Sequence, residues 1–273
     1  MSVLPILVHF GGFVIHTYGV MIALGAVALI YVAWHWAERF GIDPEKHFRG
    51  AVYLALAGII GPKLFLVIQD FHFYVRQPAA LLTVSFWESG GIFYGGIVCG
   101  LLVLTAYTYR HKLSWFGVAD ALAPGIAIGQ SIGRLGCFSA GCCWGKPTTG
   151  FFGYTFHSAY AHATVGVPLG VELYPTQLLM AAGQLVIFLI LWRVASRRTF
   201  DGQVAAIYLL CYGVFRFLID FLRYYVPSAM LFGGLLTDAQ LTSLCLIALG
   251  IGIWIARSRL PAALPAGVAS IAP

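Results

Sequence analysis

The chain has 273 residues, of which 60% are hydrophobic and only 10% are charged, against about 25% charged residues in a typical soluble domain. This composition excludes a soluble protein built around one core, because most of the apolar surface would face water, and it favours a bilayer as the solvent. The net charge of +6 is spread over short loops between apolar segments, and no segment resembles a nucleic-acid-binding module, so we expect no nucleic-acid partner.

Seven apolar segments are long enough to cross a bilayer, which takes about 20 mainly apolar residues. We expect them at residues 13–34, 50–69, 91–109, 117–135, 174–194, 203–223 and 235–256. The predicted fold is therefore an all-α integral membrane protein with seven transmembrane helices. Residues 1–260 are expected to form a single transmembrane domain, and residues 261–273, rich in Pro and Ala, a flexible C-terminal tail.

The distribution of basic residues predicts the orientation in the membrane. Ten of the sixteen Lys and Arg residues lie on one side: Arg39, Lys46, Arg49, Arg110, Lys112, Arg193, Arg197, Arg198, Arg257 and Arg259. The positive-inside rule places this side in the cytoplasm, so we expect the N-terminus outside and the C-terminus in the cytoplasm. On the outer side, residues 136–173 contain no apolar span, and we expect them to form a small extracytoplasmic cap.

Glycines recur every fourth residue in the third and fourth spans. They are Gly91, Gly95, Gly96 and Gly100 in the third span and Gly125, Gly129 and Gly133 in the fourth. Small residues at this spacing are typical of closely packed transmembrane helices. If these two spans pack together, Tyr94 and Arg134 lie near a common cavity; close packing alone explains the glycines equally well.

Four basic residues lie within or at the end of apolar spans, namely Lys63, Arg134, Arg216 and Arg223. A charge inside a membrane costs at least about 2.5 kcal/mol unless it is paired or faces water. In the predicted orientation all four lie in the outer half of the membrane, which indicates an anionic ligand there. Structural roles also stay open: Lys63 and Arg223 can extend to the interface, and Arg216 can pair with Asp220 one helical turn later.

Three cysteines, Cys137, Cys142 and Cys143, lie in the segment GQSIGRLGCFSAGCCWG of residues 129–145. Their spacing lacks the paired cysteines and histidines of a zinc site, so we predict no metal. Two interpretations stay open. Cys137 and Cys142 can form a disulfide or redox pair, because the outer face is oxidising, or they can serve as small packing groups.

Seven short motifs occur in order between about residues 10 and 256. The most specific is ADALAPGIAIGQSIGRLGCFSAGCCWG at residues 119–145. The others are IHTYGVMIALG, GPKLFLVIQD, WESGGIFYGGIVCG, YPTQL, FRFLIDFLR and TDAQLTSL. Together they resemble the motifs of the prolipoprotein diacylglyceryl transferase family, whose central signature reads approximately G-R-x-G-N-F-x-N-x-E-x-x-G.

The resemblance implies a transferase of the bacterial cytoplasmic (inner) membrane. Such an enzyme moves the diacylglyceryl group of phosphatidylglycerol to the cysteine thiol of a lipoprotein precursor and releases glycerol 1-phosphate. Phosphatidylglycerol and lipoprotein precursors are then the partners, and no cofactor is implied. Two alternatives stay open: a divergent lipid transferase with another acceptor, and an anionic-lipid transporter, for which we find no sequence-related halves.

The resemblance also implies roles for individual residues. Two essential arginines of the family fall on Arg134 and Arg216, and Tyr94 falls on the position of a His proposed as base, so these three are the expected catalytic residues. Arginine suits a phosphate because its donor fork is bidentate and always charged. The residues expected to bind phosphatidylglycerol are Tyr18, Lys63, Gln130, Cys137, Cys142, Asp220 and Arg223.

The chain departs from the family motifs at three polar positions. Tyr94 replaces His, Cys137 replaces Asn and Cys142 replaces Glu, while Asp220 in place of Glu is a mild change. A phenol ionises only near pH 10 in water, so tyrosine is a poor general base at neutral pH. Activation of the acceptor thiol is then left to the phosphate oxygens, or to Tyr94 if a cation lies beside it.

Overall fold

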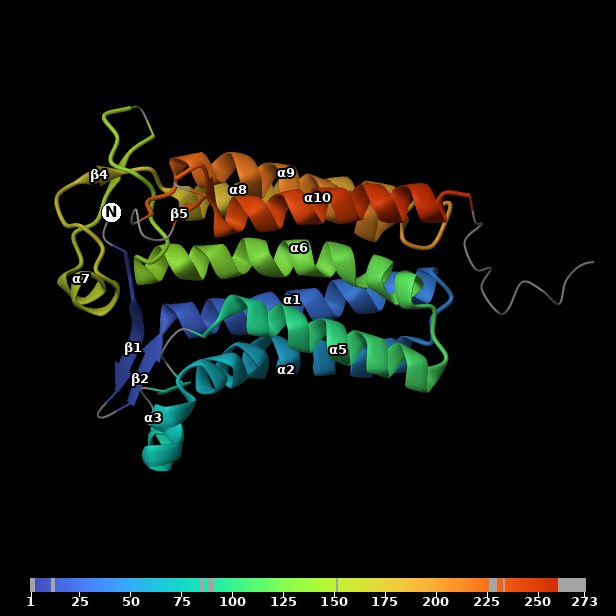
Figure 1. The fold of residues 1–273 in the computed structure, drawn as a ribbon, viewed down its shortest axis with the longest axis horizontal. Helices are drawn as coiled ribbons and strands as arrows, with labels where there is room; N and C mark the ends of the chain where they lie inside the picture. The colour runs from blue at the N-terminus through green and yellow to red at the C-terminus, as the bar shows by residue number, and fades with distance from the viewer. Residues whose placement is uncertain are drawn as a thin grey trace, which may run out of the picture.

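The computed structural model describes residues 3–10, 13–83, 86–87, 91–150, 152–225, 230–232 and 234–259. Within them, seven helices of 17 or more residues lie side by side in one bundle (Figure 1). They are α1 (Thr17–Arg39), α2 (Pro44–Gln69), α5 (Phe93–His111), α6 (Trp115–Ala140), α8 (Thr176–Ala195), α9 (Gln203–Ile219) and α10 (Asp238–Arg257). The predicted tail, residues 261–273, lies outside the described residues.

Five of these helices are long and apolar enough to cross a membrane: α1, α2, α8, α10, and α9 together with the 3-10 helix η2 (Asp220–Leu222). The other two, α5 and α6, run alongside them in the bundle (Figure 1). Their sequences carry more glycine and polar residues, which lower their hydropathy. The chain is therefore a mostly helical, multi-pass membrane protein, and the crossing of the membrane by all seven helices stays a prediction.

The first helix begins later than predicted. Residues 13–16, which we expected in the first span, form strand β2 (Phe13–His16) and pair antiparallel with β1 (Ile6–Phe10). The first helical residue, Thr17, then hydrogen-bonds back to this segment: its backbone N–H donates to the Pro5 carbonyl at 3.0 Å and its hydroxyl to the Leu4 carbonyl at 2.5 Å. These contacts fix where α1 leaves the hairpin.

Helix α6 continues five residues beyond the predicted end of the fourth span at residue 135. It begins at a side-chain cap, since the Ser114 hydroxyl accepts the Gly117 N–H at 3.1 Å. It ends at Gly141, whose φ of 75° lies in the left-handed region that favours glycine. Residues 136–140, which we expected in the cap, therefore belong to the helix.

The segment between α6 and α8 covers one end of the bundle, on the left in Figure 1. It contains β3 (Tyr154–Thr155), α7 (Ala159–Val165) and β4 (Glu172–Leu173). Its small core consists of Phe156, Ala161, Val167 and Leu173, with Val3 from the N-terminal segment. Three short elements lie at the same end: α3 (Phe71–Arg76), β5 (Met230–Leu231) and β6 (Leu236–Thr237). We call residues 141–175 the cap; its position outside the membrane stays a prediction.

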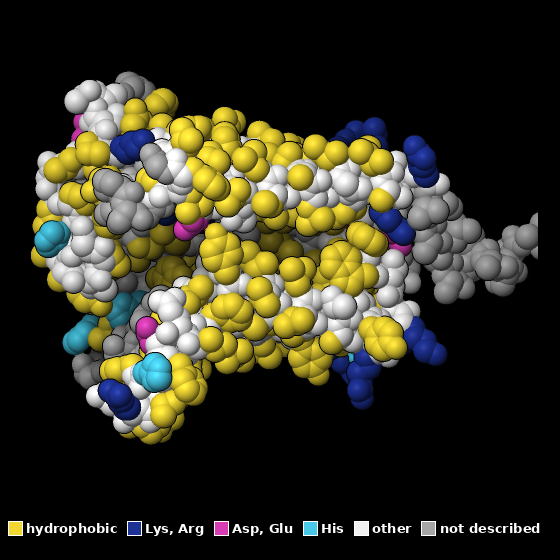
Figure 2. Space-filling view, in the orientation of Figure 1, with side chains coloured by type: hydrophobic (Ala, Val, Ile, Leu, Met, Phe, Trp, Pro, Cys, Tyr) yellow, Lys and Arg dark blue, Asp and Glu magenta, His cyan; other side chains and the backbone are white. Residues whose placement is uncertain are grey.

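The main core lies between α1, α6 and α8, where Trp36, Ala121 and Leu191 are completely buried. The flank of the bundle is covered by hydrophobic side chains (Figure 2). Val27 and Leu102, each 64% exposed, are examples. An apolar surface of this extent would be unfavourable in water and suits contact with lipid.

The two glycine stripes do mark close helix contacts, and each stripe has a different partner helix. A Cβ added at Gly125 would lie 2.6 Å from the Leu29 carbonyl oxygen in α1, and one added at Gly95 would lie 2.5 Å from the Gly61 carbonyl oxygen in α2. Helix α6 thus packs on α1, and α5 packs on α2. The alternative that the two stripes pack on each other does not hold, because spacing predicts a close-packed face without identifying the helix that occupies it.

We expect Gly125→Ala to lower the free energy of unfolding by about 1–3 kcal/mol, because the new methyl group would overlap the α1 backbone. Thermal unfolding of the purified protein in detergent measures the loss. Gly100→Ala in α5, where no atom lies within 4 Å of the added Cβ, is the matched control. An unchanged unfolding temperature for Gly125→Ala would show that α1 and α6 do not pack this closely.

Candidate functional site

At the cap end of the bundle, the C-terminus of α9 carries a buried ion pair. Nη1 of Arg216 lies 2.5 Å from Oδ1 of Asp220, and both side chains are buried. The Tyr225 hydroxyl donates to the same oxygen at 2.6 Å and accepts from Nη2 of Arg216 at 3.2 Å. The other oxygen, Oδ2, accepts from the Thr237 hydroxyl. The Asp220 carboxylate is thus fully engaged in orienting Arg216.

Thr237, which donates to Asp220 from the start of the last helix, is itself held in place by hydrogen bonds. Thr237 is the N-cap of α10: its hydroxyl accepts the Gln240 N–H, and Oε1 of Gln240 accepts the Thr237 N–H, both at 3.1 Å. This capping box is a strong local signal for a helix start. Arginine has five N–H groups, and two of them on Arg216 have partners among the described residues. The rest of its donor fork remains for a ligand.

Arg134 faces this pair from α6. Its guanidinium lies within electrostatic range of four titratable side chains, those of Arg216, Tyr212, Cys137 and Cys143. Among the described residues, no carboxylate forms an ion pair with Arg134, although its side chain is half-buried. A cation removed from water without a counter-charge is unfavourable, so the position is suited to an anion that comes from outside the chain.

Arg223 adds a third guanidinium. Its backbone forms a β-bridge with Gly145 of the cap, and its guanidinium lies 5.4 Å from the centre of the Tyr225 ring. Its Nε is buried and has no hydrogen-bond partner within the described part of the chain. Its charge acts on Cys143. The cap therefore joins the end of α9 through the backbone and holds Arg223 beside the other two arginines.

The three cysteines of the signature segment come together on one turn. The Sγ atoms of Cys137, Cys142 and Cys143 all lie within 4.8 Å of one another, and all three thiols are free. Hydrogen bonds with Cys137 and Cys142, followed by the charges of Arg223 and Arg134, lower the pKa of the Cys143 thiol. Cys143 therefore lies in a positive electrostatic environment beside the arginines.

The first turn of α8 donates hydrogen bonds to the backbone of the segment that carries Cys142 and Cys143. The Thr176 hydroxyl donates to the Cys143 carbonyl at 2.8 Å, and Nε2 of Gln177 donates to the Cys142 carbonyl at 2.7 Å. Both donors belong to the YPTQL motif, so two motifs far apart in the sequence meet here. Cys143 itself has a φ of 61°, in the left-handed region, and depends on such contacts.

Two further predicted residues lie beside this cluster. Tyr18, in the first turn of α1, is 42% exposed, and its hydroxyl interacts electrostatically with Arg134 and Cys137. Gln130, one helical turn before Arg134, interacts with the hydroxyl of Tyr208 in α9. The structure therefore gathers α1, α6, α9 and the cap around the arginines.

Lys63 and Tyr94 contact other elements. Nζ of Lys63 donates to the Phe86 carbonyl at 2.5 Å and lies 5.1 Å from the centre of the Phe86 ring. The Tyr94 hydroxyl lies 3.0 Å from Oγ1 of Thr242 and so links α5 to α10. Figure 2 shows that this face of the molecule is hollowed between α10 and α5.

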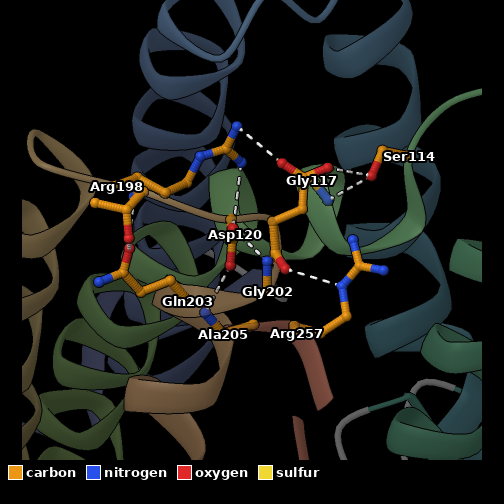
Figure 3. A network of polar contacts seen from close by, with 10 residues as sticks. Ser114, Gly117, Asp120, Arg198, Gly202, Gln203, Ala205 and Arg257 are labelled. Carbon is orange, nitrogen blue, oxygen red and sulfur yellow. Dashed lines mark hydrogen bonds and ion pairs between the residues drawn. The ribbon is translucent and has the colours of Figure 1, made fainter. Parts of the chain in front are cut away.

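A polar network that we did not predict lies at the opposite end of the bundle (Figure 3). The completely buried Asp120 of α6 accepts from the Gly202 N–H at 2.7 Å, the Ala205 N–H at 2.9 Å and Nη1 of Arg198 at 3.2 Å. Its carboxylate thus caps the N-terminus of α9, where the helix dipole favours negative charge.

The same network continues through the connection before α9 to the start of α6 and to the end of α10. Arg198 also pairs with Asp201 at 3.1 Å, Ser114 donates to Oδ2 of Asp201 at 2.6 Å, and Nε of Arg257 donates to the Asp201 carbonyl at 3.2 Å. Because each carboxylate here has a cationic partner, the network serves the fold rather than a ligand. A single aspartate inside the apolar fourth span was the signal that could have predicted it.

The comparisons with known proteins cover nearly the whole chain. Residues 5–256 match the family model of prolipoprotein diacylglyceryl transferase. The chain is 32% identical over 254 residues to a phosphatidylglycerol–prolipoprotein diacylglyceryl transferase of Clostridium tetani, covering 92% of this chain and 96% of that protein. A protein of the same name from Pseudomonas putida is 32% identical over 272 residues, covering 96% and 97%. One from Clostridium perfringens is 29% identical over 240 residues, covering 88% and 90%.

Proposed function

The chain belongs to the prolipoprotein diacylglyceryl transferase family, and from this premise we propose that it transfers the diacylglyceryl group of phosphatidylglycerol to the cysteine thiol of a lipoprotein precursor. The acceptor sulfur forms a bond to a glycerol carbon, the bond from that carbon to the phosphate oxygen breaks, and glycerol 1-phosphate leaves. No nucleic acid takes part.

The observation that supports this best is the charge balance at the cap end. Three guanidinium groups, those of Arg134, Arg216 and Arg223, lie with the single carboxylate of Asp220. The site therefore has more cationic than anionic side chains. The phosphodiester of phosphatidylglycerol carries one negative charge, so it would offset part of this excess.

The depth of the arginines in the membrane also fits a phospholipid headgroup. Helix α6 has 26 residues and is about 39 Å long, whereas the hydrocarbon core of a bilayer is about 30 Å thick. Arg134 lies six residues before the end of α6 at Ala140, or about 9 Å along the axis. This position is close to the boundary where lipid phosphates lie.

The proposed division of labour follows from these contacts. Arg134 and Arg216 stabilise the charge that develops on the departing phosphate, as preorganised donors do, and the acceptor sulfur reacts as its thiolate. The proposed lipid-binding residues are Tyr18, Lys63, Gln130, Cys137, Cys142, Asp220 and Arg223. The hollow between α5 and α10 (Figure 2), which opens onto the apolar flank, is suited to the acyl chains.

We also propose that the cap faces the outside of a bacterial inner membrane, with the C-terminus in the cytoplasm. Arg110, Arg198 and Arg257 lie at the end of the bundle away from the cap, in or next to the last turns of α5, α8 and α10. Such a basic end is expected on the cytoplasmic side.

We expect Tyr94→Phe to lower kcat by about 100-fold, within the range for loss of one oriented hydrogen-bond donor to the reacting groups. The reason is that its hydroxyl is oriented by Thr242, and the phenyl ring keeps the packing. Thr242→Val, which leaves the hydroxyl but removes its partner, should cost less, about tenfold. Steady-state rates on a precursor peptide measure both. If Tyr94→Phe retains full activity, the catalytic role of Tyr94 is wrong.

The transferase assignment is tested with the purified full chain in lipid nanodiscs containing phosphatidylglycerol. A precursor peptide should gain the mass of one diacylglyceryl group, and the same peptide with its cysteine changed to serine should not. No mass gain from folded protein, together with failure to rescue a cell depleted of its own transferase, would contradict the proposal. Modification of another membrane protein in that cell would instead identify a different acceptor.

A further inference from the structure

We propose that the thiols of Cys137, Cys142 and Cys143 form a binding site for a soft, thiophilic metal ion of the Cu(I) class. The spacing in the sequence did not predict this site, because it lacks the paired pattern of a zinc site. The fold supplies what the spacing does not: Cys137 lies in the last turn of α6, and the chain then turns back at Gly141, so that the next two cysteines return to it.

The geometry of the sulfur atoms suits three-coordinate binding. All three Sγ atoms lie within 4.8 Å of one another. In a trigonal site with metal–sulfur bonds of about 2.3 Å, the sulfur atoms are about 4.0 Å apart. Small side-chain rotations therefore bring the three sulfurs to the required separation, with the ion between them. Thiolate ligands favour Cu(I) over the hard cations.

The backbone around the thiols is held from outside the turn. Thr176 and Gln177 donate hydrogen bonds to the carbonyls of Cys143 and Cys142, and the Cys142 N–H donates to the Cys137 carbonyl at 3.1 Å. Such supporting contacts orient metal ligands before the ion arrives. The three side chains are half-buried, which limits competition from water.

The surrounding charge suits a thiolate complex. Three thiolates and one Cu(I) carry a net charge of minus two. The charges of Arg134 and Arg223 both act on Cys143, and neither arginine has an ion-pair partner among the residues described. These two guanidinium groups offset the negative charge of the complex, so copper and the lipid phosphate would compete for the same two arginines.

The test uses the purified, reduced full chain in detergent, without lipid or peptide, so its result does not depend on transferase activity. Cu(I) is titrated without oxygen against a chromophoric copper chelator. We expect one tightly bound ion per chain and a copper site with sulfur as its only ligand by X-ray absorption. Cys137→Ser, Cys142→Ser and Cys143→Ser should each lose this ion, and Cys99→Ser and Cys211→Ser, outside the cluster, should keep it.

Two outcomes would overturn the proposal. Retention of copper by all three cluster variants, with unchanged unfolding temperatures, would show that the ion binds elsewhere. Isolation of the chain from the membrane with two of the cluster thiols oxidised, and no copper uptake after reduction, would identify a disulfide pair instead. If copper binds as expected but no lipid is transferred, the metal site holds and only the proposed transferase function fails.

Discussion

Changing Arg134 to alanine is expected to lower kcat/KM for diacylglyceryl transfer about a thousandfold while leaving the unfolding temperature unchanged. Loss of one preorganised donor to a developing negative charge costs about 100- to 1,000-fold, and here the donor is a full charge. In the described part of the chain Arg134 has no ion-pair partner. Its removal therefore leaves no buried carboxylate without a counter-charge, and stability should not fall.

Arg216→Ala should differ from Arg134→Ala in one measurable respect, its effect on stability. It removes the same kind of donor but also leaves the buried Asp220 without its cation, so stability should fall with activity, by about 3–5 kcal/mol. Rates with the precursor peptide and thermal unfolding in detergent are measured for both variants. Arg110→Ala, exposed at the other end of the bundle, is the control. Near-normal transfer by Arg134→Ala would contradict the proposed phosphate site.

Asp120→Ala is expected to destabilise the fold by about 3–5 kcal/mol, because it breaks a buried ion pair and leaves two N–H groups at the start of α9 without their acceptor. Asp120→Asn should be less harmful, since the amide oxygen still accepts a hydrogen bond. Chemical unfolding in detergent, followed by circular dichroism, measures the change.

The matched control for this prediction is Asp238→Ala. Asp238 is exposed in the first turn of α10, where a carboxylate is worth about 0.3–1 kcal/mol. If Asp120→Ala unfolds at the same denaturant concentration as the native chain, the network in Figure 3 contributes little to stability, and its role in the fold is refuted.

The helices could be predicted well because each depends on a local property, the length of an apolar segment. The errors arose where contacts between residues far apart in the sequence determine the structure. Residues 13–16 are as apolar as the helix that follows, yet they pair with β1. The glycine stripes likewise revealed that a contact exists, whereas its partner, α1 for α6, is set by the arrangement of the whole bundle.

Only the charged residues of the candidate site could be predicted from the sequence. Arg216 and Asp220 are one turn apart, so their pairing follows from helix geometry. Tyr225 and Thr237 complete the environment of Asp220. Tyr225 follows the helix in irregular chain and carries no local signal, and the capping box at Thr237 predicts a helix start but not its contact with Asp220. The meeting of three thiols was missed for the same reason: it depends on the left-handed turn at Gly141.

Helix α6 is attached to α9 at two levels. At one level, the Asp120 carboxylate accepts hydrogen bonds from backbone N–H groups at the start of α9. At the other, 14 residues later and about 21 Å along the axis of α6, Arg134 lies near Arg216. A slide of α9 by one turn, about 5.4 Å, would carry its first amides out of reach of that carboxylate. The axial register of the two arginines is therefore set at the end of the bundle away from the cap.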